Sequence, residues 1–343
     1  MTGTPHLLPE TPDVAPDILS DVLGRLHLSG TVLVRADFHE PWGVTTPEAC
    51  QLTPLLPLRT DRIIPFHIIA AGGCWIELND HHPVWLNEGD AVLLPYGDGH
   101  ALHGREAIVP IAVGGLLPDP PWTDIVALAH GGTGAGTRII CGFLQCDDLL
   151  CHPMLRHLPR LLHVDSAWAA DAWLAGTIRH AAAEACRPQP GSRSLLSRLT
   201  ELMFVEMLRQ HMQDLPANEI GWFAALNDEV TGAGLQLLHA APFDDWTVER
   251  LARRVGVSRT VLAGRFKHFL DQPPMQYLTH WRLSLAAHAL SSGDSPVKAV
   301  AAETGYDSEA AFSRAFRRCF GMPPAAWRRR ASAKPPATPT PST

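Results

Sequence analysis

The sequence has little of what marks membrane-spanning and secreted chains. It contains no run of about 18 apolar residues, which excludes a membrane-spanning helix. Its first residues carry neither a basic segment nor an apolar core, so we expect no secretory signal. The seven cysteines lack the regular spacing of a disulfide framework and fit a reducing compartment. These absences together predict a cytoplasmic protein.

Lysine is absent from the first 242 residues, and charge is divided unevenly along the chain. Residues 1–242 hold 13 Arg against 27 acidic residues, a balance of −14. Residues 243–330 hold 14 basic and 8 acidic residues, a balance of +6, and Lys334 completes the net charge of −7. A basic C-terminal module on an acidic body predicts that only one domain meets phosphate. A length of 343 residues suggests two or three domains.

Short apolar runs broken by turn residues occupy the N-terminal half of the chain. This pattern predicts an antiparallel β-barrel or sandwich, which we place at residues 17–165. The expected strands are Ile63–Ala70, Cys74–Asn79, Val84–Leu86, Ala91–Pro95 and Arg138–Cys146. The two ends of the chain, residues 1–16 and 331–343, are rich in Pro and Thr and are predicted to be disordered.

Apolar residues recur at helical spacing further along the chain, in Ala167–Cys186 and Ser192–Met212. We assign residues 166–218 to a helical connector, which a polar linker near Gln213–Glu219 ends. Two interpretations of these helices stay open. They form a dimer interface, or they pack against the core of their own β-domain.

The last hundred residues contain an internal repeat. Leu251-Ala252-x-x-x-Gly256-x-Ser258 matches Val300-Ala301-x-x-x-Gly305-x-x-Ser308, at an offset of 49 to 50 positions. Each copy has the pattern of two helices joined by a tight turn, which is typical of a helix-turn-helix. Two such units can place two recognition helices in successive major-groove segments of one DNA duplex.

The two units, residues 247–270 and 297–320, predict which side chains face DNA. Thr247 and Ser258 are expected to cap the helices of the first unit, with Gly256 in the turn. The expected helices are Val248–Val255, Arg259–Leu270, Met275–Leu290, Val297–Thr304 and Ser308–Phe320. The side chains expected to pack inward are Leu262, Phe266, Phe269, Phe312, Phe316 and Phe320. The residues expected at the DNA are Ser258, Arg259, Thr260, Ala263, Lys267, His268, Ser308, Glu309, Ser313, Arg314, Arg317 and Arg318, of which Lys267 and Arg318 suit phosphate.

This region resembles the DNA-binding domain of the AraC/XylS family of bacterial transcription regulators. The most specific string is Gly305-Tyr306-x-Ser308-Glu309-x-x-Phe312-Ser313-Arg314-Ala315-Phe316, followed by Phe320-Gly321-Met322-Pro323-Pro324. The resemblance covers residues 235–330 within an expected domain at 226–330. It implies an all-α tandem helix-turn-helix domain that reads a bipartite site on double-stranded DNA. It also implies a transcription activator that contacts RNA polymerase.

One position departs from the family pattern. Gly264 stands where the first unit commonly has Arg or another polar residue, whereas the second unit keeps Arg314. We therefore predict that the second unit carries more of the sequence discrimination than the first.

The N-terminal region resembles the cupin family, whose small β-barrels often hold a metal or a small ligand. The string Gly89-(x5)-Pro95-x-Gly97-x-x-His100 is similar to the second cupin motif. Residues 20–165 are similar to the cupin sensor domains of some AraC-type regulators. The resemblance implies a domain that senses an oxidant or a small organic effector.

Only part of the cupin metal set is present, because Ile69 stands where a second histidine of the first motif is expected. Four residues remain candidates for a sensor site: His67, Cys74, His100 and His103. They can converge as a zinc site or a thiol sensor, or they are ordinary interior residues with Cys74 as a small buried hydrophobe. Cys141, Cys146, Cys151 and His152 invite a second metal hypothesis, but their spacing favours core packing.

The sequence as a whole predicts an α+β multidomain protein: a cupin-like antiparallel barrel, a helical connector and a tandem helix-turn-helix domain. We expect a homodimeric transcription regulator without catalytic activity or a required cofactor, although a metal in the cupin-like domain stays open. The alternative is a metal-dependent cupin enzyme fused to a DNA-binding module. A redox-switched repressor acting through Cys74 is a second alternative.

Overall fold

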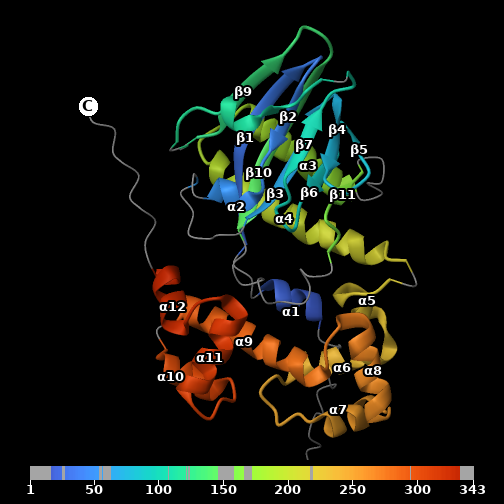
Figure 1. Cartoon of the computed structure of the whole chain (residues 1–343), viewed down its shortest axis with the longest axis vertical. Coiled ribbons are helices and arrows are strands. Elements are labelled where there is room, and N and C mark those ends of the chain that lie inside the picture. The colour runs from blue at the N-terminus through green and yellow to red at the C-terminus, as the bar shows by residue number, and fades with distance from the viewer. Residues whose placement is uncertain are drawn as a thin grey trace, which may run out of the picture.

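The computed structural model shows a β-domain followed by a helical domain (Figure 1). It describes residues 17–24, 28–53, 56, 63–106, 108–120, 122, 124–145, 158–165, 172–216, 219–293 and 295–332. The segments 1–16 and 333–343, predicted to be disordered, lie outside these residues. The sequence predicts disorder from residue 331 onward, but Ala331 and Ser332 belong to the final helix, which ends at Ser332. In the described part of the chain, no helix is long and apolar enough to cross a membrane.

The strands of the β-domain form two separate sheets, so the predicted closed barrel is not confirmed. The first sheet has the order β11 (Leu162–Val164), β6 (Ala91–Leu93), β3 (Ile63–Ala71), β10 (Gly136–Gln145), β1 (Ser29–His39) and β9 (Val126–Gly131). The second has the order β5 (Val84–Asn87), β4 (Gly73–Leu78), β7 (His100–His103), β2 (Gly43–Thr46) and β8 (Ile111–Ala112). Most neighbours are antiparallel, but β9 runs parallel to β1 and β8 runs parallel to β2.

The two sheets face each other across one apolar layer, which makes the β-domain a sandwich. Ile69 and Ile139 of the first sheet share this layer with Ile76 and Leu102 of the second. Strand β3 is buried on both faces, since Phe66 on its other face lies in the cluster that contains the helices. This double burial explains why β3 is one continuous apolar run rather than an alternating one.

Helices α3 (Ala172–Cys186) and α4 (Ser192–Gln213) pack against the outer face of the first sheet. Leu196, Phe204 and Leu208 of α4 are buried there, so core packing is confirmed for this side of the helix. Strand β1 and α4 approach closely at Gly30, where an added Cβ would collide with Thr200. Two short elements, α2 (Ala49–Leu52) and the 3₁₀ turn η2 (Val113–Gly115), complete the domain.

The helical domain consists of two halves joined by one long helix. The first half contains α5 (Trp222–Asn227), α6 (Glu229–Ala240), α7 (Val248–Val255) and α8 (Arg259–Leu270). The second half contains α10 (Val297–Glu303), α11 (Glu309–Phe320) and α12 (Pro324–Ser332). Helix α9 (Pro274–Ser292) runs between them (Figure 1). The predicted bounds of α7 and α8 are confirmed, and those of α9, α10 and α11 differ by one or two residues.

The two ends of α9 belong to different cores. Tyr277 and Trp281 near its start pack with α6 and α8, whereas Ala287 and Leu290 near its end pack with Phe316 of α11. A single rigid helix therefore fixes the separation of the two halves, which a flexible linker could not do. Helix α1 (Ile18–Gly24) lies between the β-domain and the helical domain in Figure 1 and contacts α6.

Candidate nucleic-acid interface and buried cavity

The first helix-turn-helix unit has the predicted local chemistry. The hydroxyl of Thr247 accepts a hydrogen bond from the Arg250 amide at 3.1 Å, which caps α7. Gly256 ends α7 with a φ of 83°, in the left-handed region that favours glycine. The hydroxyl of Ser258 then caps α8 by accepting from the Val261 amide at 3.2 Å. The turn between the helices is therefore built from local hydrogen bonds.

The second unit repeats this construction. Gly305 has a φ of 82° after α10, and the hydroxyl of Ser308 caps α11 by accepting from the Ala311 amide at 3.2 Å. Phe312 and Phe316 of α11 are fully buried. Their burial turns the opposite face of α11 toward solvent.

Most residues predicted to meet DNA lie on the exposed faces of α8 and α11. Those exposed are Ser258, Arg259, Thr260, Lys267, His268, Ser308, Glu309, Arg314, Arg317 and Arg318. Ala263 and Ser313 are half-buried. The inward face of α8 needs one correction. Phe269 is only half-buried, and Leu270 takes the fully buried position because helical periodicity places it beneath Phe266.

The cations of the two units differ in their partners. Arg259 donates to the Glu249 carboxylate at 2.7 Å, and this hydrogen bond lowers the pKa of Glu249. Lys267 forms an ion pair with Asp271 one turn later. Arg314 forms no ion pair with any residue of the described chain and is exposed. The guanidinium of Arg314 is therefore available for a base edge, whereas Arg259 must first leave Glu249.

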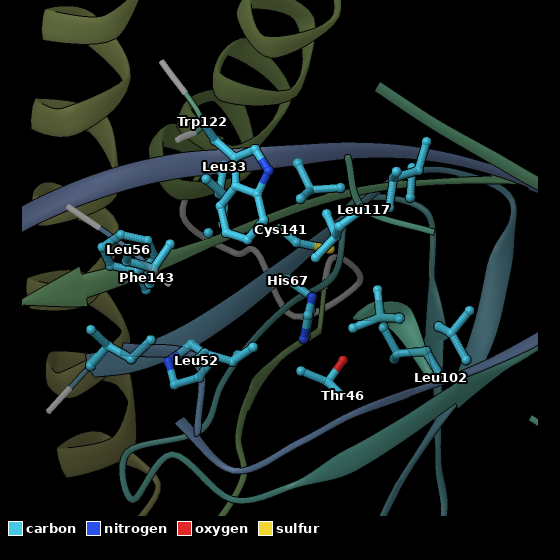
Figure 2. A pocket seen from close by; sticks show the side chains of 18 of the residues that line it. Leu33, Thr46, Leu52, Leu56, His67, Leu102, Leu117, Trp122, Cys141 and Phe143 are labelled. Atoms are coloured by element: carbon cyan, nitrogen blue, oxygen red, sulfur yellow. The ribbon is translucent and has the colours of Figure 1, made fainter. Parts of the chain in front are cut away.

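The interior of the sandwich contains a cavity of about 90 Å³ (Figure 2). Its lining is almost entirely apolar and comes from both sheets. Leu33, Leu102, Leu117 and Phe143 are among the lining side chains. The polar exceptions are Thr46, His67 and Cys141.

Two of the predicted sensor residues contact each other beside this cavity, and His67 is the one that lines it. The Nε2 atoms of His67 and His100 lie 2.8 Å apart, and both side chains are buried. His100 Nδ1 lies 3.0 Å from the backbone oxygen of Asp98. Burial lowers the pKa of His67 well below its ordinary value, and the neighbouring His100 lowers it further. Burial likewise lowers the pKa of His100. We therefore treat the pair as neutral imidazoles.

Family models match both halves of the chain. The cupin model matches residues 17–213, and the helix-turn-helix domain model matches residues 251–330. A putative AraC-like transcription regulator of Streptomyces lividans is 33% identical over 273 residues, which cover 78% of this chain and 87% of that protein. The chain belongs to the AraC family of transcription regulators. It is a DNA-binding regulator with an N-terminal cupin domain, as the sequence predicted.

Further similarities span most of the AraC-family chain or its DNA-binding domain alone. A putative AraC-like transcription regulator of Streptomyces antibioticus is 29% identical over 318 residues, covering 92% of this chain and 98% of that protein. Among solved structures, the DNA-binding domain of AdpA in complex with a target DNA is 31% identical. That match has a TM-score of 0.28 and covers 30% of this chain and 95% of the other.

The cupin domain of this AraC-family protein does not assemble the metal-binding set of cupin enzymes. His103 lies on the opposite face of β7 from His100 and pairs with Glu77 at 3.1 Å. Cys74 is buried but does not line the cavity. Of the two interpretations left open by the sequence, convergence of all four residues is therefore not observed, and Cys74 is a small buried side chain as in the other interpretation. Within the described residues, no three His, Cys, Asp or Glu side chains are placed to hold a metal.

Cys74 and Cys141 of the cupin domain lie in poor surroundings for thiolate chemistry. Cys74 is fully buried, and burial strongly raises the pKa of its thiol. Burial raises the pKa of Cys141 to about 12. Cys141 packs in the apolar layer, as its neighbours in the sequence predict, and it also lines the cavity. Cys146, Cys151 and His152 of the second metal hypothesis lie outside the described residues.

Strands β1 and β2 contribute lining residues that were not predicted from the sequence. In β1, Val34, Ala36 and Phe38 line the cavity, while Arg35 and Asp37 face the other way. This alternation of apolar and polar residues is the usual signal of a half-buried strand. The signal was present in the sequence and identifies the strand, although not the empty space beside it.

We expect Gly264→Ala to stabilise the helical domain by about 0.5–1 kcal/mol, because alanine has the higher helix propensity. A Cβ added at Gly264 meets no atom within 4 Å. Gly234→Ala in α6 is the matched control, since its Cβ would lie 2.9 Å from the Phe266 ring. Urea unfolding should show a gain for the first variant and a loss for the second. A loss at Gly264 would contradict the open surroundings of that position.

The buried histidine pair predicts a loss of stability in acid. Both pKa values are lowered in the folded state, so only the unfolded chain takes up protons as the pH falls below roughly 6.5. The stability that the neutral pair contributes is present above that pH and is lost below it, by up to about 1.4 kcal/mol per pH unit for each histidine. The drop in melting temperature from pH 7.5 to pH 5.5 should be smaller in His67→Phe than in the wild type. Equal falls would show that His67 does not titrate in this way.

Proposed function

We propose that this chain is a transcription activator controlled by a small molecule bound in the cavity of its cupin domain. The observation that carries the proposal is an almost entirely apolar cavity between the two sheets. Natural cores are packed without voids of this size, and concave apolar spaces with a few polar groups are typical of ligand sites. An oxidant sensor at Cys74 is less well supported, since that thiol is inaccessible.

A route for the signal runs through β1 and α4. One face of β1 lines the cavity at Val34 and Ala36, and α4 packs against the other side of the same sheet. The close contact between Gly30 and Thr200 leaves no room for a side chain between strand and helix at that point. A ligand that displaces β1 therefore displaces α4, whose far end precedes the DNA-binding domain. The proposed result is altered DNA occupancy and altered contact with RNA polymerase.

Filling the cavity tests the proposal. Thr46→Phe places a ring in the cavity from β2, whereas Thr45→Phe, one residue earlier, places it on the exposed opposite face. We would place the intergenic DNA beside the gene before a reporter in the native host and vary the growth conditions. The Thr46→Phe chain should still bind that DNA in vitro but give constant reporter output, and Thr45→Phe should respond as the wild type does.

Two results would count against this function. A Thr46→Phe chain that responds as fully as the wild type would remove the cavity from regulation. A rise in reporter output after deletion of the gene would show that the protein represses transcription rather than activating it.

We further propose a homodimer formed through the outer side of α4. Leu195 and Leu202 are 37% and 47% exposed, and the half-buried Leu199 lies between them on the same helical face. Leu202→Glu should yield monomers in sedimentation equilibrium, whereas Ser194→Glu on the neighbouring face should not. A wild-type chain that is monomeric at the same concentration would contradict this arrangement.

A further inference from the structure

The hydrogen positions of the histidine pair follow from its surroundings. The backbone oxygen of Asp98 can only accept, so His100 Nδ1 carries the proton and donates to it. In a neutral imidazole, Nε2 of His100 must then be the acceptor. The hydrogen bond of 2.8 Å therefore requires that His67 Nε2 carries a proton and donates. This assignment leaves Nδ1 of His67 without a proton, as a bare acceptor.

That acceptor is buried and unmatched. His67 is 5% exposed, and its Nδ1 has no hydrogen-bond partner among the described residues. His67 lines the cavity (Figure 2), and its Nε2 is already committed to His100. Nδ1 is therefore the ring atom left to meet whatever enters the cavity. Buried polar groups in proteins are nearly always hydrogen-bonded, so an unmatched one beside an apolar cavity indicates a missing ligand group.

The other lining residues determine which charge and size of ligand the cavity can accept. Apart from Thr46, His67 and Cys141, the described residues of the lining are apolar, and none of them has a charged side chain. A carboxylate would point its lone pairs at the lone pair of Nδ1 and would lose its hydration without a compensating charge. A cavity of about 90 Å³ also limits the size of the ligand to a single ring or a short chain.

We propose that the cavity binds a small, uncharged, apolar molecule whose one hydroxyl donates a hydrogen bond to His67 Nδ1. Phenols and short alcohols are the chemical classes that fit. The inference rests on the proposed function, because it names the chemistry of the effector that the cupin domain would sense.

Three probes of one ring separate the possibilities in calorimetric titrations of the full chain at pH 7.5. Phenol carries the donor, toluene has the same number of heavy atoms without it, and benzoate carries a negative charge. We expect phenol to bind at least about tenfold more tightly than toluene, since only phenol satisfies the buried acceptor. Benzoate should bind more weakly than phenol. Equal binding of phenol and toluene, tighter binding of benzoate, or no binding of phenol would overturn the inference.

A variant assigns the preference to one residue. His67→Phe keeps a ring and removes the acceptor, so the ratio of phenol to toluene affinity should fall to near 1. His103→Phe, on the outer face of β7, should keep the wild-type ratio. A preference that survives in folded His67→Phe would overturn the assignment. The wild-type ratio tests the donor requirement even if this variant does not fold.

These titrations contain no DNA, so their failure differs from failure of the proposed function. A cavity that prefers phenol but leaves the reporter unresponsive would support the ligand chemistry and refute the regulation. If the reporter depends on the open cavity but phenol and toluene bind equally, only the requirement for a hydroxyl in the ligand would be refuted.

Discussion

Arg314→Ala is expected to weaken binding to the cognate DNA site by about tenfold or more and to relax its sequence specificity, as loss of a bidentate base contact does. Arg314 lies on the exposed face of α11 without an ion-pair partner in the described structure. Arg259 on α8 is held by Glu249 at 2.7 Å, so a DNA contact would have to replace an existing one. Arg259→Ala should therefore cost less than Arg314→Ala.

The measurement requires a cognate site selected from random DNA and a scrambled site of equal length. Fluorescence anisotropy at one fixed salt concentration gives the ratio of the two affinities for each variant. Arg314→Ala should reduce that ratio, while Lys267→Ala should weaken both affinities alike if Lys267 meets phosphate. A larger loss of specificity in Arg259→Ala would reverse the predicted order of the two units.

The DNA-binding units could be predicted closely because their determinants are local. Thr247, Gly256 and Ser258 fix the ends of two helices through hydrogen bonds to residues within a few positions. A periodic apolar face then orients the exposed residues. The charge division between the two parts of the chain supported the same conclusion.

The cupin domain was harder to predict because its pairing is long-range. Strand β1 pairs with β10 about a hundred residues later, and its parallel neighbour β9 was not predicted from the sequence. His67 and His100 meet only because β3 and β7 face each other across the sandwich. His103 was grouped with them by proximity in the sequence, although strand alternation places it on the opposite face.

A buried network at the start of α9 was not foreseen either. The Trp222 indole donates to the Tyr277 hydroxyl at 3.0 Å, and that hydroxyl lies 2.8 Å from His239 Nε2. His239 Nδ1 lies 3.2 Å from the Asp21 carboxylate of α1. One proton order satisfies every contact: Tyr277 donates to His239, and His239 donates to Asp21. The network connects helix α1 to the DNA-binding domain. In the sequence, Asp21 is 218 residues from His239, and Tyr277 is 38 residues from it.

Tyr277→Phe is expected to lower the free energy of unfolding by about 2–4 kcal/mol, although it removes only one oxygen. Both Trp222 and His239 lose the hydrogen bond that they make to the hydroxyl, and an unmet buried polar group costs about 1–3 kcal/mol. The matched control is Tyr306→Phe in the second half of the domain. The buried Tyr306 hydroxyl has no hydrogen-bond partner among the described residues, so its removal relieves an unmet polar group and should raise rather than lower the free energy of unfolding.

Urea unfolding of the full chain, followed by tryptophan fluorescence, distinguishes the two variants. The same chemical change in both proteins keeps the lost volume equal, so the difference between them reports whether the removed hydroxyl has hydrogen-bond partners. Equal effects in the two variants would mean that the Tyr277 hydroxyl contributes no more to the free energy of unfolding than a hydroxyl without hydrogen-bond partners. A loss confined to Tyr277→Phe would show that this hydroxyl holds α5, α6 and α9 together, and with them the contact of α1 to the DNA-binding domain.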